Sequence, residues 1–356
     1  MNKYLKRGLI ISISVTVGLL FIYTGGSLIG AGIANKNMCQ NRGSTTTNYQ
    51  DFRYQYQNTY KDYALMQNVK EVTFSSSVSL KGYYYEVDNP LGLIISIHGF
   101  KGFALDTTTQ YQNYFLEKGY NVFAFDLMGH GASDGDGIGD FYQSKIDIIN
   151  AYNYLKESNL SGDLPVFLVG YSLGAYGAII ASEEIDVKAV VSFSSYDKPA
   201  ELYLSTAEDY VNGDLSFFKP GLDLSLLIEN GLNYFSSASE VIKRNQNTKY
   251  IVIQGDKDNY VSMNKYSLYA RVKDLNLENT TIYPLENITH MDPWKSYEAH
   301  QYEDGIKDQY QELLNKYNRA IPNDIYQDFL SSINKEKASE LNISLVDDIY
   351  NIFLNN

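Results

Sequence analysis

The sequence is short of several residues on which specialised chemistry depends. Its 356 residues include one cysteine and four histidines. A single cysteine excludes an internal disulfide, and the sequence contains neither a metal-binding cluster nor a phosphate-binding loop. Lys and Arg number 29 against 42 Asp and Glu, a formal net charge of −13, which argues against nucleic acid as a partner. We therefore expect chemistry that needs no cofactor and no metal.

The most informative pattern that is present is a G-x-S-x-G motif at Gly170–Gly174. The apolar residues 165–169 precede it, and the small and apolar residues 175–180 follow it. This context predicts a strand before the motif and a helix after it. A sharp strand-to-helix turn holds a serine hydroxyl exposed beside a base, so Ser172 is the candidate nucleophile.

A serine nucleophile of this type needs an imidazole and a carboxylate, which follow it along the chain in the order serine, acid, histidine. Two of the four histidines precede Ser172, which leaves His290 and His300. His290 follows the apolar run 281–285, whereas His300 lies in a polar stretch that reads as a helix. Active-site groups belong on loops at strand ends, and this favours His290 as the base.

The acid is expected in the loop after the strand before His290. Residues 250–255 form such a strand, and Asp256 and Asp258 compete in the loop that follows. Asp256 suits a turn-capping role, whereas Asp258 lies deeper in the loop. The sequence therefore favours Asp258 over Asp256.

An oxyanion formed during acyl transfer needs two N–H donors, one directly after the nucleophile and one from an earlier strand-to-helix loop. The apolar strand 91–97 ends in the loop His98–Gly102. The backbone N–H groups of Phe100 and Leu173 are therefore the candidate oxyanion donors. We interpret His98 as a structural residue that fixes the loop.

Taken in order, these motifs resemble the α/β-hydrolase superfamily, and most closely the branch that holds monoacylglycerol lipases, lysophospholipases and small serine aminopeptidase-like enzymes. The resemblance covers roughly residues 70–300 and includes the stretch Asp126–Ser133 after a strand. It implies that this stretch is a structural loop, so that neither Asp126 nor His130 is catalytic. It also implies a helical cap inserted over the site.

Apolar strands alternate with helices from about residue 70 onward. This alternation predicts an α/β fold with a mostly parallel sheet covered by helices on both faces. We expect a catalytic domain over residues 69–300, with the cap at about 197–248. Residues 301–356 have helical spacing and are expected to form a C-terminal extension, to which the sequence gives no function.

Residues 8–34 carry no charge and are long enough to cross a bilayer. Three basic residues precede this run, so residues 1–34 are expected to be a single-pass transmembrane helix that leaves the catalytic domain outside a bacterial cell. A cleaved signal peptide ending near Ala34, and hence secretion, is the alternative. Residues 35–68 are polar and are expected to form a stalk.

The sequence thus predicts a membrane-anchored serine hydrolase that cleaves carboxylic esters of lipid-like or other small acyl compounds through an acyl-enzyme. A serine peptidase is the first alternative, although the loop His98–Gly102 departs from the Gly-Gly-Pro-Gly pattern of relatives that trim N-terminal proline. A non-catalytic surface-anchored interaction domain is the second. The ordered serine, acid and histidine argue against it.

Overall fold

The computed structural model describes residues 39–45, 52–211, 213–231 and 236–356, together with Tyr23, Gly25, Gly26, Gly30, Gly32 and Lys36. The described residues contain one sheet of eight strands in the order β1-β2-β4-β3-β5-β6-β7-β8. The strands are β1 (Lys70–Ser75), β2 (Ser79–Tyr85), β3 (Leu93–Ile97), β4 (Asn121–Phe125), β5 (Val166–Tyr171), β6 (Ala189–Phe193), β7 (Lys249–Gly255) and β8 (Thr280–Leu285). Strand β2 pairs antiparallel with β1 and β4, and all other pairs are parallel.

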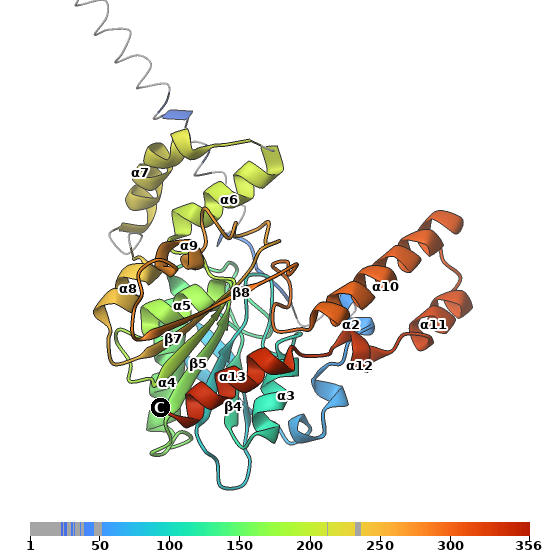
Figure 1. Cartoon of the computed structure of the whole chain (residues 1–356), viewed down its shortest axis with the longest axis horizontal. Helices are drawn as coiled ribbons and strands as arrows, with labels where there is room; N and C mark the ends of the chain where they lie inside the picture. The colour runs from blue at the N-terminus through green and yellow to red at the C-terminus, as the bar shows by residue number, and fades with distance from the viewer. Residues whose placement is uncertain are drawn as a thin grey trace, which may run out of the picture.

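Helices connect and cover these strands (Figure 1). In the first half of the chain they are α2 (Phe52–Gln55), η2 (Tyr60–Asp62), η3 (Ala64–Met66), α3 (Thr109–Glu117), α4 (Gln143–Glu157) and α5 (Leu173–Ala181). In the second half they are α6 (Pro199–Val211), η4 (Ser216–Phe218), α7 (Lys219–Asn230), α8 (Ala238–Arg244), α9 (Leu268–Val272), α10 (Tyr297–Lys316), α11 (Asn323–Ser331), α12 (Lys335–Ala338) and α13 (Ile343–Leu354).

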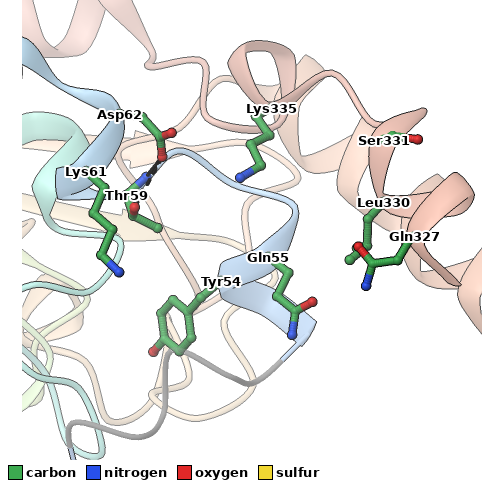
Figure 2. A pocket seen from close by; sticks show the side chains of 9 residues that line it. All are labelled: Tyr54, Gln55, Thr59, Lys61, Asp62, Gln327, Leu330, Ser331 and Lys335. Carbon is green, nitrogen blue, oxygen red and sulfur yellow. Dashed lines mark hydrogen bonds between the residues drawn. The ribbon is translucent and has the colours of Figure 1, made fainter. Parts of the chain in front are cut away.

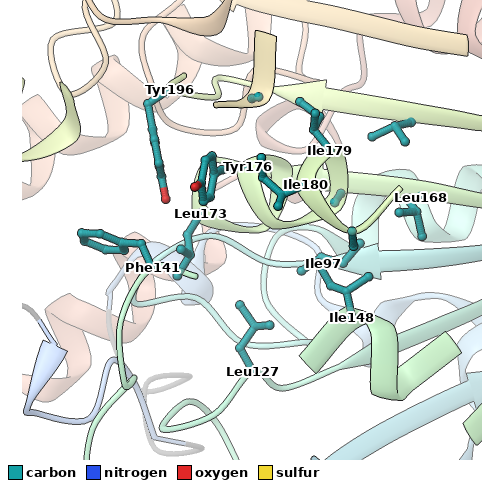
Figure 3. Packing of buried hydrophobic residues seen from close by; sticks show 14 of the residues in the cluster. Ile97, Leu127, Phe141, Ile148, Leu168, Leu173, Tyr176, Ile179, Ile180 and Tyr196 are labelled. Atoms are coloured by element: carbon teal, nitrogen blue, oxygen red, sulfur yellow. The ribbon is translucent and has the colours of Figure 1, made fainter. Parts of the chain in front are cut away.

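The central strands are apolar on both faces because both faces are covered. Every residue of β3, β4, β5 and β6 is buried, as expected for parallel strands between two helical layers. Side chains from α4, α5 and α8 pack on one face, and side chains from α3 and α13 pack on the other. Figure 3 shows part of the first layer, in which α4 and α5 meet β3 and β5 through Ile148, Leu173, Tyr176, Ile179, Ile180, Ile97 and Leu168. The predicted mostly parallel α/β sheet is therefore confirmed.

The N-terminal segment differs from the sequence prediction. A polar stalk is wrong for much of residues 35–68, because Cys39, Ser44, Tyr56, Gln57 and Met66 are all buried. Many of the polar groups in this segment bond to polar groups of the domain, so no apolar periodicity marks the contact. Most of the uncharged run 8–34 lies outside the described residues. Among the residues that are described, no helix has the length and apolarity needed to cross a bilayer, so the membrane anchor stays a prediction.

The C-terminal residues do not form one separate appendage. The boundary expected at residue 300 falls inside α10, and α13 returns to the sheet (Figure 1). The hairpin of α10 and α11 extends away from the sheet and, with α12, faces the N-terminal segment around α2. Figure 2 shows the open pocket of about 520 Å³ between these parts, which is lined by residues of α2, η2, α11 and α12.

The clearest test of this C-terminal packing is a comparison of two adjacent residues in α13. The Phe353 ring is buried and stacks on Phe167 with centroids 4.3 Å apart, whereas Leu354 is 49% exposed. Phe353→Ala should lower the free energy of unfolding by about 3–5 kcal/mol because it leaves a cavity against the sheet. Leu354→Ala should change it by less than about 0.5 kcal/mol. Urea unfolding of both variants is the measurement, and equal effects would show that α13 does not contribute to the core.

Candidate active site

The G-x-S-x-G motif forms the turn between β5 and α5. Ser172 lies in this turn with φ 52° and ψ −111°, a backbone conformation that costs a non-glycine residue energy. Two hydrogen bonds hold it there. The Ser172 N–H donates to the carbonyl of Phe193 in β6 at 2.8 Å, and its carbonyl accepts from the Tyr176 N–H at 3.0 Å. The neighbouring strand and the helix thus maintain the strained turn.

The two glycines of the motif are required by close backbone contacts. A Cβ at Gly170 would lie 2.5 Å from the carbonyl oxygen of Gly174, and a Cβ at Gly174 would lie 2.5 Å from the carbonyl oxygen of His98. These neighbours are backbone atoms, which cannot rotate away. The motif therefore lets α5 begin directly against the end of β3.

The structure brings Ser172, His290 and Asp258 together in one hydrogen-bonded chain. The distance from Ser172 Oγ to His290 Nε2 is 3.1 Å, and the distance from His290 Nδ1 to Asp258 Oδ2 is 2.7 Å. All three residues are buried. With the Nδ1 proton donated to the carboxylate, Nε2 is left to accept the serine proton. The arrangement can therefore activate the hydroxyl for attack on a carbonyl.

The contacts of the two aspartates distinguish them. Asp258 Oδ1 accepts the N–H groups of Tyr260 and Val261 at 3.0 and 2.8 Å, and its Oδ2 also accepts from Gln254 Nε2 at 2.8 Å. These donors fix the carboxylate that contacts His290. Asp256 is exposed at the surface of the same loop. The structure thus places Asp258, the residue favoured from the sequence, beside the histidine.

The loop after β3 lies directly against the nucleophile. A Cβ at Gly99 would come within 3.3 Å of Ser172 Cβ and 2.8 Å of Tyr171 Cδ1. The loop then turns back, with Lys101 at φ 62° and the Gly102 N–H bonded to the Gly99 carbonyl at 3.0 Å. Phe100 lies within this turn, and Leu173 is the first residue of α5, so both expected oxyanion donors belong to backbone next to Ser172.

The other histidines have structural contacts. His98 Nδ1 lies 2.8 Å from the Gly99 carbonyl and its Nε2 accepts the Leu127 N–H at 3.0 Å. Burial, and then the neighbouring His130, lowers the pKa of His98 well below its usual value, so the ring stays neutral and links two loops. His300 lies in α10, and its buried Nε2 has no hydrogen-bond partner among the described residues.

The loop after β4 is held by contacts within itself and by contacts to the loop after β3. Asp126 Oδ1 accepts the Ala104 N–H at 2.7 Å and Oδ2 accepts the Ala132 N–H at 2.8 Å. Burial raises the pKa of Asp126 to about 6. His130 Nδ1 lies 3.0 Å from the Met128 carbonyl, and burial lowers the pKa of His130 to about 4. His130 Nε2 also accepts the Lys101 N–H at 3.4 Å. Both side chains therefore make structural contacts that join the loops after β3 and β4, in agreement with the structural role that the resemblance implied.

The insertion between β6 and β7 contains α6 and α7, which lie together at one end of the sheet (Figure 1). Its large apolar residues divide into two groups. Leu202, Leu204, Leu222 and Leu226 are buried. Phe217 and Phe218 are 73% and 44% exposed and contact Tyr23. The buried leucines hold the insertion together, whereas the two phenylalanines lie at its surface.

Sequence reasoning missed a buried ionic cluster beside the histidine loop. Arg53 and Lys295 both pair with Asp292, and Lys295 also pairs with Glu303 at 2.6 Å. Lys295, Asp292 and Glu303 have side chains that are at most 5% exposed. Arg53 lies 239 positions before Asp292, so no local pattern in the sequence could have linked them.

Among the described residues, no group of three or more His, Cys, Asp or Glu side chains is arranged to hold a metal ion.

The family model described as serine aminopeptidase, S33, matches residues 88–255. The match contains the loop after β3, the G-x-S-x-G turn and the strand that precedes Asp258. It ends before the loop that carries His290.

Similar proteins include two esterases. Caffeoylshikimate esterase from Arabidopsis thaliana is 37% identical over 78 residues, which is 20% of this chain and only 24% of that protein. The solved structure of esterase Pf2001 from Pyrococcus furiosus has a TM-score of 0.52 at 16% identity, with 70% of this chain and 91% of that chain covered. A second crystal form of Pf2001 gives a TM-score of 0.51 at 17% identity and covers 70% and 90% of the two chains. The structural likeness shows a shared fold.

The buried imidazole of His130 predicts a pH dependence of stability. Its folded pKa of about 4 lies below the ordinary value of 6.5, so the unfolded chain binds the proton first as the pH falls. The contribution of neutral His130 to the free energy of unfolding is fully present above about pH 6.5 and is lost as the pH falls from 6.5 to 4. His130→Asn keeps a donor for the Met128 carbonyl but cannot titrate. In that window, the unfolding free energy of the wild type should fall with pH more steeply than that of the variant, by up to about 1.4 kcal/mol per pH unit.

Urea unfolding of both proteins at several pH values measures this difference. All other titrating groups are common to the two proteins, so the comparison reports mainly the loss of the His130 titration. Parallel curves between pH 4 and 6.5 would contradict a neutral buried His130.

Proposed function

We propose that this chain is a serine hydrolase of the α/β-hydrolase superfamily, and that it cleaves carboxylic esters of lipid-like or other small acyl compounds through an acyl-enzyme. The observation that carries this proposal is the continuous hydrogen-bonded chain from Ser172 through His290 to Asp258. It lies at the end of the parallel sheet, beside a loop that contacts Ser172.

In the proposed reaction, Ser172 Oγ attacks the substrate carbonyl carbon while His290 Nε2 takes the hydroxyl proton. Asp258 stabilises the imidazolium that forms. The carbonyl oxygen becomes an oxyanion and accepts hydrogen bonds from the N–H groups of Phe100 and Leu173. When the C–O bond breaks, the imidazolium gives its proton to the leaving alcohol. A water molecule, deprotonated by His290, then releases the acid by the same route.

Ester cleavage is favoured over peptide cleavage by the two esterases to which the chain is similar. The family model, described as serine aminopeptidase, makes a serine peptidase the second candidate. The two functions differ in the leaving group, an alcohol or an amine, and therefore require different assays. Comparing p-nitrophenyl esters of increasing acyl length with aminoacyl p-nitroanilides distinguishes them.

The assignment of the three catalytic residues predicts large losses of activity with the fold intact. Ser172→Ala and His290→Ala should each lower kcat by at least roughly 10³-fold, because the members act as one unit. Asp258→Asn should lower kcat by about 10⁴-fold, since the amide favours the wrong imidazole tautomer. The matched control, Asp256→Asn, should change it by less than about threefold because an exposed carboxylate contributes little there. Initial rates on the preferred p-nitrophenyl ester measure these effects.

Labelling with a fluorophosphonate probe completes the test, because the probe reacts only with an activated serine. The wild type should be labelled at Ser172, and Ser172→Ala should not. An unlabelled wild type would contradict the serine hydrolase mechanism. A larger loss for Asp256→Asn than for Asp258→Asn would move the acid to residue 256.

We also propose that residues 8–34 anchor the protein in a cell membrane with the catalytic domain outside. The support is the uncharged run itself and the three basic residues before it: Lys3, Lys6 and Arg7. The excess of acidic residues over basic ones would keep the domain away from an anionic lipid surface.

This topology predicts that protease added to intact cells digests the catalytic domain, because the domain would lie on the outer side. Immunoblotting against the C-terminus is the measurement, with a cytoplasmic protein as the control that must survive. Full protection of the domain would contradict the outward orientation. A mature N-terminus at Asn35 would show the cleaved, secreted form instead.

A further inference from the structure

We propose that Arg53, in the segment before the sheet, is a positioning residue for His290, and that the N-terminal strap to which it belongs holds both sides of the active site. The N-terminal strap is residues 39–45 and 52–57. The inference rests on the proposed function, since it concerns the same site. The strap lies outside residues 88–255, to which the family model matches.

The first part of the strap holds the loop that contains Phe100. Ser44 Oγ donates to the Gly102 carbonyl at 2.5 Å and accepts the Gly131 N–H at 3.1 Å. It therefore joins the loop after β3 to the loop after β4. Arg42 adds hydrogen bonds to three carbonyls of the second loop, those of Gly131, Ser133 and Gly135, at 3.0, 3.0 and 2.8 Å.

The same part of the strap packs tightly against the loop after β4. The Gly43 N–H donates to the Gly129 carbonyl at 2.8 Å, and the Ile138 N–H donates to the Cys39 carbonyl at 2.9 Å. A Cβ at Gly43 would lie 2.0 Å from His130 Nε2. The strap therefore packs on backbone and on a buried ring, and it forms part of the wall behind the oxyanion loop.

The second part of the strap holds the loop that carries His290. Arg53 Nη2 bonds to Asp292 Oδ1 and to Thr107 Oγ1, the latter at 3.1 Å. Thr107 Oγ1 itself donates to Asp292 Oδ1 at 2.7 Å. Asp292 follows His290 by two residues and has φ 49°, so its side chain fixes a left-handed turn next to the histidine.

The ionic cluster around Asp292 is balanced in charge, and three of its four side chains are buried, whereas that of Arg53 is 28% exposed. Arg53 and Lys295 supply two positive charges, and Asp292 and Glu303 supply two negative ones. Burial by itself would raise the pKa of Asp292, but Arg53 and then Lys295 hold that pKa far below its usual range. Removal of one member leaves an uncompensated buried charge. Asp292 can then move or take up a proton, and either change weakens the contacts that fix the turn beside His290.

The remaining contacts of this loop do not replace Arg53. The Tyr171 hydroxyl donates to the His290 carbonyl at 3.0 Å, which holds the backbone at one point. Gln57 of the strap bonds to Glu303 and accepts from Gln110 Nε2 at 3.2 Å. These contacts keep the fold together around the cluster, whereas Arg53 is the strap residue that contacts Asp292.

The test compares Arg53→Met, Arg53→Lys and Thr107→Val with a matched control, Arg244→Met. Arg244 also pairs with a carboxylate through two N–H groups, at 2.9 and 3.1 Å from Glu183, but it lies in α8 at the surface. Arg53→Met should lower kcat by roughly 10²-fold with KM changed less than about threefold, since misplacement of a base affects the chemical step. Arg53→Lys should recover part of kcat, because it keeps the charge but lacks the planar guanidinium that places Nη2 against both Asp292 and Thr107. Arg244→Met should leave kcat unchanged.

Each enzyme is assayed under conditions where urea titration shows it to be folded, so that a loss of stability alone does not alter kcat. If Arg53→Met does not fold, Arg53→Lys and Thr107→Val decide the question, and each should lower kcat by several-fold. A folded Arg53 variant with the kcat of Arg244→Met would overturn the proposal. The proposal is also overturned if Arg53→Lys and Thr107→Val both have the kcat of the wild type.

A measurement without substrate separates this inference from the proposed function. The proton between His290 Nδ1 and Asp258 should give a low-field proton resonance in the wild type, and this resonance should weaken or shift in Arg53→Lys but not in Arg244→Met. An unlabelled, inactive wild type would refute the proposed function while the resonance still tests the positioning. An unchanged resonance in Arg53→Lys would overturn the positioning role.

Discussion

The left-handed backbone of Ser172 is the constraint on which the rest of the structure depends. It requires a carbonyl from β6 on one side and the first turn of α5 on the other, so the parallel order of β5 and β6 is part of the site. It also requires three glycines, at positions 99, 170 and 174. A Cβ at any of them would lie less than 3 Å from atoms of β5, α5 or the end of β3. A rigid sheet covered on both faces is what maintains such a turn.

The three residues of the hydrogen-bonded chain come from loops that follow β5, β7 and β8, and each loop is held in a different way. The serine is fixed by glycine packing. Asp258 is fixed by donors from its own loop and strand. The histidine loop is the least local of the three, because it is held by a buried ionic cluster whose members come from α2, the loop itself and α10. This difference explains why a residue as distant as Arg53 can affect the position of His290.

Most of the sheet and the choice of Ser172, Asp258 and His290 could be predicted, because local patterns mark them. The buried strands are apolar runs, and the turn after β5 has a motif whose glycines have a steric cause. Chain order and loop position then selected one histidine and one aspartate from a few candidates. The N-terminal strap could not be predicted in this way. Its buried residues include Ser44 and Gln57, and its Arg53 is half-buried and paired with Asp292. Polar residues that are buried through pairing look the same in a sequence as polar residues in solvent.

The sequence by itself determined the features that depend on neighbours along the chain: the strands, the strained turn, and the residue types of the hydrogen-bonded chain. Only the tertiary structure decided which distant residues complete the surroundings of the site. It placed α13 on the sheet through Phe353, left Phe217 and Phe218 at the surface of the insertion, and paired Arg53 with Asp292. The physical reason is that these contacts depend on burial and charge pairing between segments hundreds of residues apart, and neither leaves a periodic signal in the sequence.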